Sequence, residues 1–301
     1  MNALPPVHVI GATGRSGQAL TAALHARGRT VIPVVRSIGK ISAALRPYAR
    51  QADLEHPEAL AMALHDAQCV ISTAHARYFP TLLTATTDKV RLIGLGSTRK
   101  FTRWPDEHGN GVLAGEKALL ASGRPGMILH PTMIYGAQGE DNVQRLAALL
   151  RRLPVVPLPN SGRSLVQPVY QDDVTRALLA ALNLADSGDL DGPESLVVAG
   201  PEAMTYREFI ESILKAAGLG RRIFLPVSGG ILEFLAPVAA KCPGFPSIGR
   251  AEIRRLLEDK AFCIEPMQTR LGFNPLPLKD GLSHLFRTSN ETSTLPAGKC
   301  S

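Results

Sequence analysis

Short apolar runs alternate with amphipathic segments through the first 130 residues of the chain. The apolar runs are rich in β-branched residues, which is typical of buried strands, and they lie at 7–10, 30–35, 69–72, 90–95 and 127–130. The segments between them predict helices over 15–27, 41–48, 57–66, 80–87 and 112–121, with a short strand that ends at 52. Continuous apolar strands that alternate with helices indicate an α/β fold with a doubly wound parallel sheet.

In the second half of the chain the pattern is looser. Prolines at 154–159 predict a loop, and a helix follows over 172–184 with Asp172 as its N-cap. Thr205, with a Glu three residues later, predicts a capping box at the start of another helix. The apolar stretch 229–240 is too short to span a membrane, so we interpret it as a core or pocket-lining helix.

The net charge is +7, from 33 basic and 26 acidic residues. The basic residues are scattered and do not form a stripe with interleaved aromatics, so we expect no nucleic-acid partner. They are either a solvated surface or an attraction for anionic cofactors and substrates. The four cysteines contain no C-x-x-C pair, and the N-terminus has no secretory signal pattern. We therefore expect a cytoplasmic protein with reduced thiols and no membrane span.

A glycine-rich turn follows the first predicted strand directly and opens the first predicted helix. Its sequence is Gly11-Ala12-Thr13-Gly14-Arg15-Ser16-Gly17. Glycines at this spacing allow a tight turn, close approach of the backbone to a pyrophosphate, and close packing of helix on strand. The start of the helix adds N–H groups and the positive end of the helix dipole. We therefore predict that residues 11–17 bind a dinucleotide.

The end of the second predicted strand indicates which dinucleotide this is. NAD-selective sites place an acidic residue there for the ribose 2′-hydroxyl, whereas this strand ends in Arg36. Together with Arg15 of the glycine turn, Arg36 can hold a 2′-phosphate through charge-assisted hydrogen bonds. The alternative is that both are ordinary surface arginines. We predict NADP(H) as the preferred cofactor, with NAD(H) as the second choice.

Further motifs carry a resemblance that covers nearly the whole chain. They are Ala52-Asp53-Leu54, Ser72-Thr73-Ala74-His75, His130-Pro131-Thr132-Met133-Ile134-Tyr135-Gly136, Gln167 to Val174, and Arg270-Leu271-Gly272-Phe273. With the glycine turn, they resemble the extended and atypical short-chain dehydrogenase/reductases, the epimerase/dehydratase branch. The resemblance implies a Rossmann sheet of about seven strands. It also implies cofactor contacts at Asp53, Leu54, Thr73, Ala74, His75, Lys117 and Pro131.

The catalytic residues depart from that family's pattern. The resemblance implies a Ser or Thr after the fifth strand, matched by Ser97, and a Tyr four residues before a Lys, matched at Lys117. The position four residues before Lys117 is Leu113, which cannot exchange a proton. The candidate catalytic residues are therefore Ser97, Lys117 and Tyr135.

Three functions remain open. The first is a reductase or isomerase of a small carbonyl compound, in which Lys117, Tyr135 or a water held by Ser97 supplies the proton. The second is a sugar-nucleotide epimerase or dehydratase with Tyr78 or Tyr170 as substitute. The third is a binding-only protein, since the chain also resembles the nucleotide-binding accessory subunit of respiratory complex I.

The chain is expected to divide into a dinucleotide-binding domain over 1–135, a mixed substrate-binding region with returns to the core over 136–286, and a disordered tail over 287–301. Substrate should enter between the loop 97–110, Tyr135 and the segment 225–235. No metal is expected, because His75 and His108 have no second ligand at metal spacing and are interpreted as loop histidines. The resemblance offers a homodimer seam on the helix around Lys117, but the sequence does not determine the oligomeric state.

Overall fold

The structure is a computed structural model that describes residues 4–136, 142–239 and 250–293. Its main element is a seven-stranded sheet, in the order β11-β6-β5-β4-β1-β2-β3, and every neighbouring pair in it is parallel. The strands are β1 Val7–Ile10, β2 Val31–Val35, β3 Arg50–Gln51, β4 Cys69–Ser72, β5 Arg91–Leu95, β6 Gly126–Pro131 and β11 Pro193–Val198. The order reverses between β1 and β4, as in dinucleotide-binding folds. The predicted doubly wound sheet of about seven strands is confirmed.

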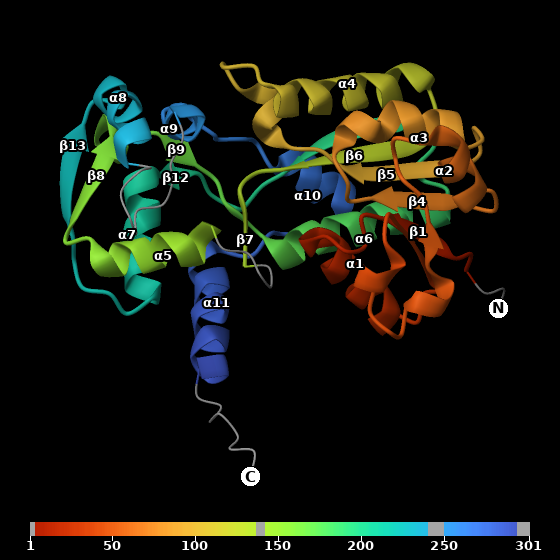
Figure 1. The fold of residues 1–301 in the computed structure, drawn as a ribbon, viewed down its shortest axis with the longest axis horizontal. Helices are drawn as coiled ribbons and strands as arrows, with labels where there is room; N and C mark the ends of the chain where they lie inside the picture. The colour runs from red at the N-terminus through yellow and green to blue at the C-terminus, as the bar shows by residue number, and fades with distance from the viewer. Residues whose placement is uncertain (1–3, 137–141, 240–249, 294–301) are drawn as a thin grey trace, which may run out of the picture.

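Helices cover both faces of this sheet (Figure 1). One face carries α2 Pro57–Ala63, α3 Phe79–Ala85 and α4 Glu107–Ser122, and the other carries α1 Arg15–Ala26, α6 Gln171–Ser187 and α10 Glu265–Leu271. Successive side chains of a strand point to opposite faces, so β1 contributes to two cores. Val9 packs in one buried cluster with Leu20 of α1, and Ile10 in another with Leu60 of α2. The sheet is thus held from both sides.

A second region lies beside the carboxyl ends of β5 and β6. It contains α5 Asn142–Arg152, α7 Tyr206–Ala216, α8 Gly229–Ala239, α9 Arg250–Leu256 and α11 Leu278–Ser293. Three two-stranded sheets join it: β7 Ile134–Tyr135 with β10 Val169–Tyr170, β9 Leu165–Val166 with β12 Met204–Thr205, and β8 Val155–Pro159 with β13 Ile223–Val227. Val143, Phe209 and Leu282 belong to its buried cluster. Between β10 and β12 the chain returns to the main sheet through α6 and β11, and then enters the second region again.

Two predicted elements were wrong. The helix over 41–48 is replaced by two 3-10 turns, η1 Ile38–Lys40 and η2 Arg46–Tyr48, and Pro47 is tolerated only in the first turn of such a helix. The loop expected at 154–159 is β8, which pairs with β13 alone. Because β8 has a free edge, its prolines cost no ladder hydrogen bonds.

Helix ends and helix environments also differed from expectation. Tyr170 is the N-cap of α6, and Asp172 lies in its first turn instead, where a carboxylate faces the positive end of the helix dipole. The capping box of Thr205 and Glu208 is confirmed. The stretch 229–240 forms α8 up to Ala239, but Phe234 is 75% exposed, so the described part of α8 is not a core helix.

The last helix, α11, continues to Ser293, past the expected start of the tail at 287. Residues 294–301 lie outside the described residues. In the described part of the chain, no helix is both long and apolar enough to cross a membrane.

Candidate functional site

At two positions of the glycine turn, the backbone geometry and the surrounding atoms leave room for glycine alone. Gly11 has a φ of +77°, and a Cβ on it would lie 2.7 Å from Thr73 Oγ1. A Cβ on Gly17 would collide with the carbonyl oxygen of Gly11. Gly14 is the N-cap of α1, and its N–H donates to the Gly11 carbonyl at 2.9 Å. The turn is therefore tight, and the start of α1 opens beside it.

Thr73, at the carboxyl end of β4, supports the turn from the neighbouring strand. Its Oγ1 donates to the carbonyls of Ile10 and Gly11, each at 3.1 Å. The backbone nitrogen of the next residue, Ala74, would lie 3.1 Å from a Cβ on Gly11. The turn and the segment after β4 thus meet at the point where the strand order reverses, which is where open α/β sheets bind ligands.

The other predicted cofactor residues lie along the same edge of the sheet. Arg36 is exposed directly after β2, and Arg15 is exposed at the first position of α1. Asp53 lies two residues after β3, and its carboxylate accepts from the N–H of Glu55 at 3.1 Å. Ser16 donates to Gln171 Oε1 at 3.2 Å and so ties the turn to α6. Thr13 accepts from Gln18 Nε2 through its carbonyl, and Leu54 is half-buried.

His75 is half-buried at the start of η3 Ala76–Tyr78, stacked edge to face on His108 with ring centroids 4.3 Å apart. Its Nδ1 accepts from the N–H of Arg77 at 3.0 Å. Burial, and then the charge of His108, lowers the pKa of His75 to about 4. Within the described residues, no three His, Cys, Asp or Glu side chains gather as a metal site.

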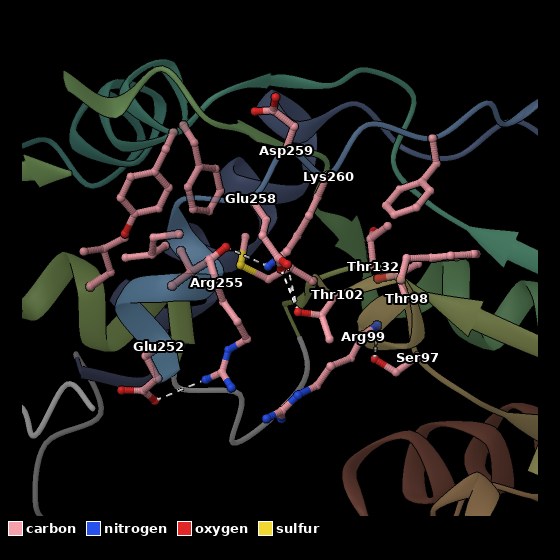
Figure 2. A pocket seen from close by; sticks show the side chains of 18 of the residues that line it. Ser97, Thr98, Arg99, Thr102, Thr132, Glu252, Arg255, Glu258, Asp259 and Lys260 are labelled. Carbon is pink, nitrogen blue, oxygen red and sulfur yellow. Dashed lines mark hydrogen bonds and ion pairs between the residues drawn. The ribbon is translucent and has the colours of Figure 1, made fainter. Parts of the chain in front are cut away.

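A cavity of about 490 Å³ opens at the carboxyl ends of β5 and β6. Ser97, Thr98 and Arg99 line it from the segment after β5 (Figure 2). Its other walls come from the second region: from α5, from the start of α7, and from α9 with the segment that follows it. The segment 225–235, expected to border the substrate, does not line this cavity, and neither do Lys117 and Tyr135.

A buried polar cluster of His130, Glu116, Lys100 and Ser195 fixes the backbone of Ser97. Its N–H donates to Nδ1 of His130 at 3.2 Å, and Nε2 of His130 lies 3.3 Å from Glu116 Oε1, a contact that is not an aligned hydrogen bond. Glu116 Oε1 also binds Lys100 Nζ and Ser195 Oγ. Burial, and then the charge of Lys100, lowers the pKa of His130 to about 4, so the imidazole is neutral at pH 7.

The three candidate catalytic residues are not brought together. Ser97 lines the cavity, and its Oγ accepts from the N–H of Arg99 at 3.2 Å. Lys117 is exposed on α4, whereas its neighbour Glu116 points inward. Tyr135 is fully buried beneath α11, where a Cβ on Gly281 would collide with its hydroxyl, and burial raises the pKa of that hydroxyl. The structure therefore supports Ser97 as a site residue more than the other two.

Several cavity residues were not predicted from the sequence. Glu258 is 5% exposed, and it accepts hydrogen bonds from Thr102 Oγ1 and from the N–H of Arg103. Arg255 and Lys260 line the same wall. The only sequence signal for them was a cluster of charges at 252–260 in an otherwise apolar stretch, which is also typical of a solvated helix.

Comparison with known proteins agrees with the geometry of the glycine turn. Residues 11–103 match a family described as NAD(P)H-binding. An uncharacterized protein of Mycobacterium tuberculosis is 26% identical over 280 residues, which cover 89% of this chain and 28% of that protein. The chain thus spans less than a third of the length of the mycobacterial relatives it matches.

Solved structures match over nearly the whole chain. An NADPH-dependent quinone oxidoreductase of Escherichia coli, complexed with NADPH, superimposes with a TM-score of 0.73 at 18% identity, covering 93% of this chain and 99% of that one. A UDP-glucose 4-epimerase of Thermotoga maritima, solved with UDP-glucose, gives a TM-score of 0.68 at 15% identity, with 96% and 100% covered. At these identities the likeness is one of fold.

The fold and the glycine turn thus agree with the family match: residues 11–103 resemble an NAD(P)H-binding domain, and the parallel sheet is arranged as in dinucleotide-binding folds. The structural neighbours include an NADPH-dependent quinone oxidoreductase and a UDP-glucose 4-epimerase, and with them the chain shares its fold.

Proposed function

We propose that the chain is an NADP(H)-dependent reductase or isomerase of a small carbonyl compound, with Ser97 as the group that binds the substrate carbonyl. One observation carries the proposal: Ser97 follows β5 and lines the cavity at the same edge of the sheet as the glycine turn. The carboxyl ends of parallel strands meet at that edge, so a dinucleotide on the turn and a substrate in the cavity are neighbours.

The hydroxyl of Ser97 is suited to this role. Its oxygen already accepts from the N–H of Arg99, so its proton is directed elsewhere and can be donated to a carbonyl oxygen. Thr98 is less suited because its hydroxyl donates to the Pro131 carbonyl at 3.3 Å. The cluster of His130, Glu116 and Lys100 fixes the backbone that carries Ser97.

The proton for the reaction needs a source other than the family's Tyr. Lys117 is exposed and Tyr135 is buried, and neither lines the cavity, so we assign the proton to a water held beside the carbonyl oxygen that Ser97 binds. The hydroxide that is left takes a proton back from solvent. NADPH, when bound, supplies the hydride. Arg15 at the start of α1 and Arg36 directly after β2 are both exposed, which supports a preference for the 2′-phosphate over a hydroxyl.

A binding-only protein is the second candidate, and the positions of Lys117 and Tyr135 favour it. A chain that holds NADPH for stability needs no proton donor at all. A sugar-nucleotide epimerase is less favoured, because it needs a proton acceptor beside the substrate, and neither Tyr78 nor Tyr170 lines the cavity.

The test begins with the nucleotide that the freshly purified protein releases on denaturation. NADPH that exchanges freely, followed by turnover in a screen of carbonyl compounds, supports a reductase. Tightly held NADPH without turnover supports the binding-only protein, and stoichiometric NAD⁺ contradicts the proposed cofactor and favours an epimerase.

Two matched variants then test the role of Ser97. Ser97→Ala should lower kcat/KM by about 100-fold, as loss of a donor to the reacting oxygen does. Lys117→Met should leave kcat/KM within about 2-fold, because the side chain is exposed. Equal losses in both variants would contradict the assignment.

A further inference from the structure

The cavity lining combines two kinds of side chain. Its apolar residues, here called the floor, include Met133, Val143, Leu149, Phe209 and Phe262. Cationic side chains also line it: Arg99 from the segment after β5, Arg255 from α9 and Lys260 just beyond it, with Arg103 and Arg145. Figure 2 shows the guanidinium groups of Arg99 and Arg255 on the same side of the pocket. A ligand that fills this cavity therefore meets both apolar surface and positive charge.

The carboxylates near this wall are engaged in structural hydrogen bonds. Glu258 accepts from Thr102 Oγ1 at 2.8 Å, and Asp259 Oδ1 accepts from the N–H of Leu165 at 2.9 Å. Asp106, which lies outside the cavity lining, forms an ion pair with Arg99 and accepts from both its Nε and its Nη2. These contacts hold the carboxylates of Glu258 and Asp259 within the cavity wall and fix the position of Arg99.

Arg255 has no such tight partner among the contacts of the described wall. Its Nη2 lies 3.9 Å from Glu252, beyond hydrogen-bond distance, and Glu252 is exposed. Lys260 Nζ donates to the backbone carbonyl of Arg255 at 3.1 Å. That acceptor is neutral, so the hydrogen bond does not neutralise the ammonium charge. Half-buried cations of this kind are stabilised by an anion that enters with a ligand.

The electrostatics of the wall point the same way. Burial, and then the like charge of Arg99, lowers the pKa of Arg255, whereas Glu252, Asp106 and Glu258 raise it. Burial also lowers the pKa of Lys260; Glu258 raises it, and the charges of Arg255 and Arg99 lower it further. The like charges of Arg99, Arg255 and Lys260 thus repel one another, and an anion bound beside Arg255 would relieve that repulsion.

We propose that the cavity binds an amphipathic organic anion, with its acidic head group between Arg99 and Arg255 and its apolar body on the floor. The head group is a carboxylate or a phosphate. The inference that this anion is the substrate rests on the proposed function, because Ser97 lines the same cavity and would bind the substrate carbonyl. The binding itself does not depend on catalysis. The volume suits one small molecule of this kind.

Isothermal titration calorimetry of the full chain saturated with NADP⁺ tests the proposal. Phenylpyruvate is the probe, phenylacetone is its neutral counterpart with the same body, pyruvate is the anion without the body, and phenyl phosphate replaces the carboxylate by a phosphate. Phenylpyruvate or phenyl phosphate should bind about 10-fold or more tightly than phenylacetone, because a partly buried charge-assisted bond adds that much. Whichever of the two binds tighter identifies the head group. Pyruvate should bind weakly because it leaves the floor uncovered.

Variants of Arg255 locate the effect. Arg255→Gln should bring the affinities for acid and neutral ketone to within about 2-fold, Arg255→Lys should keep part of the preference, and the exposed Arg221→Gln should keep all of it. In the unmodified chain, 0.5 M salt should narrow the preference, which gives a readout that needs no folded variant. Any of three results overturns the proposal. The neutral ketone binds as tightly as the acid, neither acid binds, or Arg255→Gln keeps the full preference for acid over neutral ketone. Failure to reduce phenylpyruvate while binding it contradicts only the proposed function.

Discussion

Glu258 holds Thr102 across 156 residues of sequence: Thr102 Oγ1 lies 2.8 Å from one carboxylate oxygen and 3.1 Å from the other. The N–H of Arg103 donates to the same carboxylate at 2.5 Å. The carboxylate therefore ties the segment after β5 to the segment after α9, and these two segments form adjoining parts of the cavity wall.

Removal of this carboxylate should loosen the cavity. Glu258→Ala leaves the Thr102 hydroxyl and the Arg103 N–H without their acceptor, so the free energy of unfolding should fall by about 1–3 kcal/mol. Urea denaturation measures this, with the exposed Glu202→Ala as control, expected to change stability by less than about 0.5 kcal/mol. Equal effects of the two substitutions would show that the contact contributes nothing.

The glycines of the turn should differ in their tolerance of a methyl group. Gly17→Ala pushes its Cβ into the backbone of Gly11 and should cost about 1–3 kcal/mol or more, measured without nucleotide. Gly14→Ala has its nearest contact at 3.3 Å and should cost less than about 1 kcal/mol. Gly192→Ala, which meets open space, is the control. A Gly14 variant less stable than the Gly17 variant would contradict this geometry.

Cofactor choice should depend on the two exposed arginines at the sheet edge. In the double variant Arg15→Ala with Arg36→Ala, affinity for NADPH should fall about 10- to 100-fold, because charge-assisted bonds to a 2′-phosphate are lost. NADH affinity should change by no more than about 3-fold. Fluorescence titration of both nucleotides measures the ratio, with Arg221→Ala as control. Parallel losses for NADPH and NADH would assign the arginines to surface charge alone.

Stability should depend on pH through His130. Its pKa is about 4 in the folded chain against 6.5 for an ordinary imidazole, because the ring is buried. The unfolded chain therefore binds more protons between pH 6.5 and 4, so this contribution is complete above pH 6.5 and is lost as the pH falls to 4. The loss amounts to about 3 kcal/mol at most, since one pKa unit corresponds to about 1.4 kcal/mol.

His130→Gln isolates that contribution. A glutamine can accept from Ser97 N–H and donate to Glu116, but it does not titrate. Between pH 7 and pH 4.5, chemical denaturation should show a smaller loss of stability in this variant than in the unmodified chain, while the exposed His56→Gln behaves like the unmodified chain. Identical pH profiles for all three would exclude His130 as the titrating group.

The parallel sheet and the glycine turn were predictable because their signals are local. Val7 to Gly17 encode a strand, a turn and a helix start within eleven successive positions, and a backbone collision at Gly17 depends only on neighbours in the sequence. The predicted helix over 41–48 failed for a related reason: Pro47 limited the segment to 3-10 turns.

Lys117 shows where local spacing was not enough. Adjacent positions on an α-helix are about 100° apart, so one residue decides whether a side chain faces the core or solvent. The packing of α4 turned Glu116 inward and Lys117 outward, and the motif spacing contained no information about that phase. Tyr135 likewise matched its motif, but the packing of α11 buried it.

The sequence by itself determined the α/β class, the dinucleotide turn and its neighbours along the strand ends, since periodicity and glycine spacing act over a few residues. Only the tertiary structure decided which side chains meet at the cavity. Ser97, Thr102, Arg255 and Glu258 come together because α9 and the segment after it fold back over the end of β5. Contacts across more than 150 residues depend on that packing, and no local pattern encodes them.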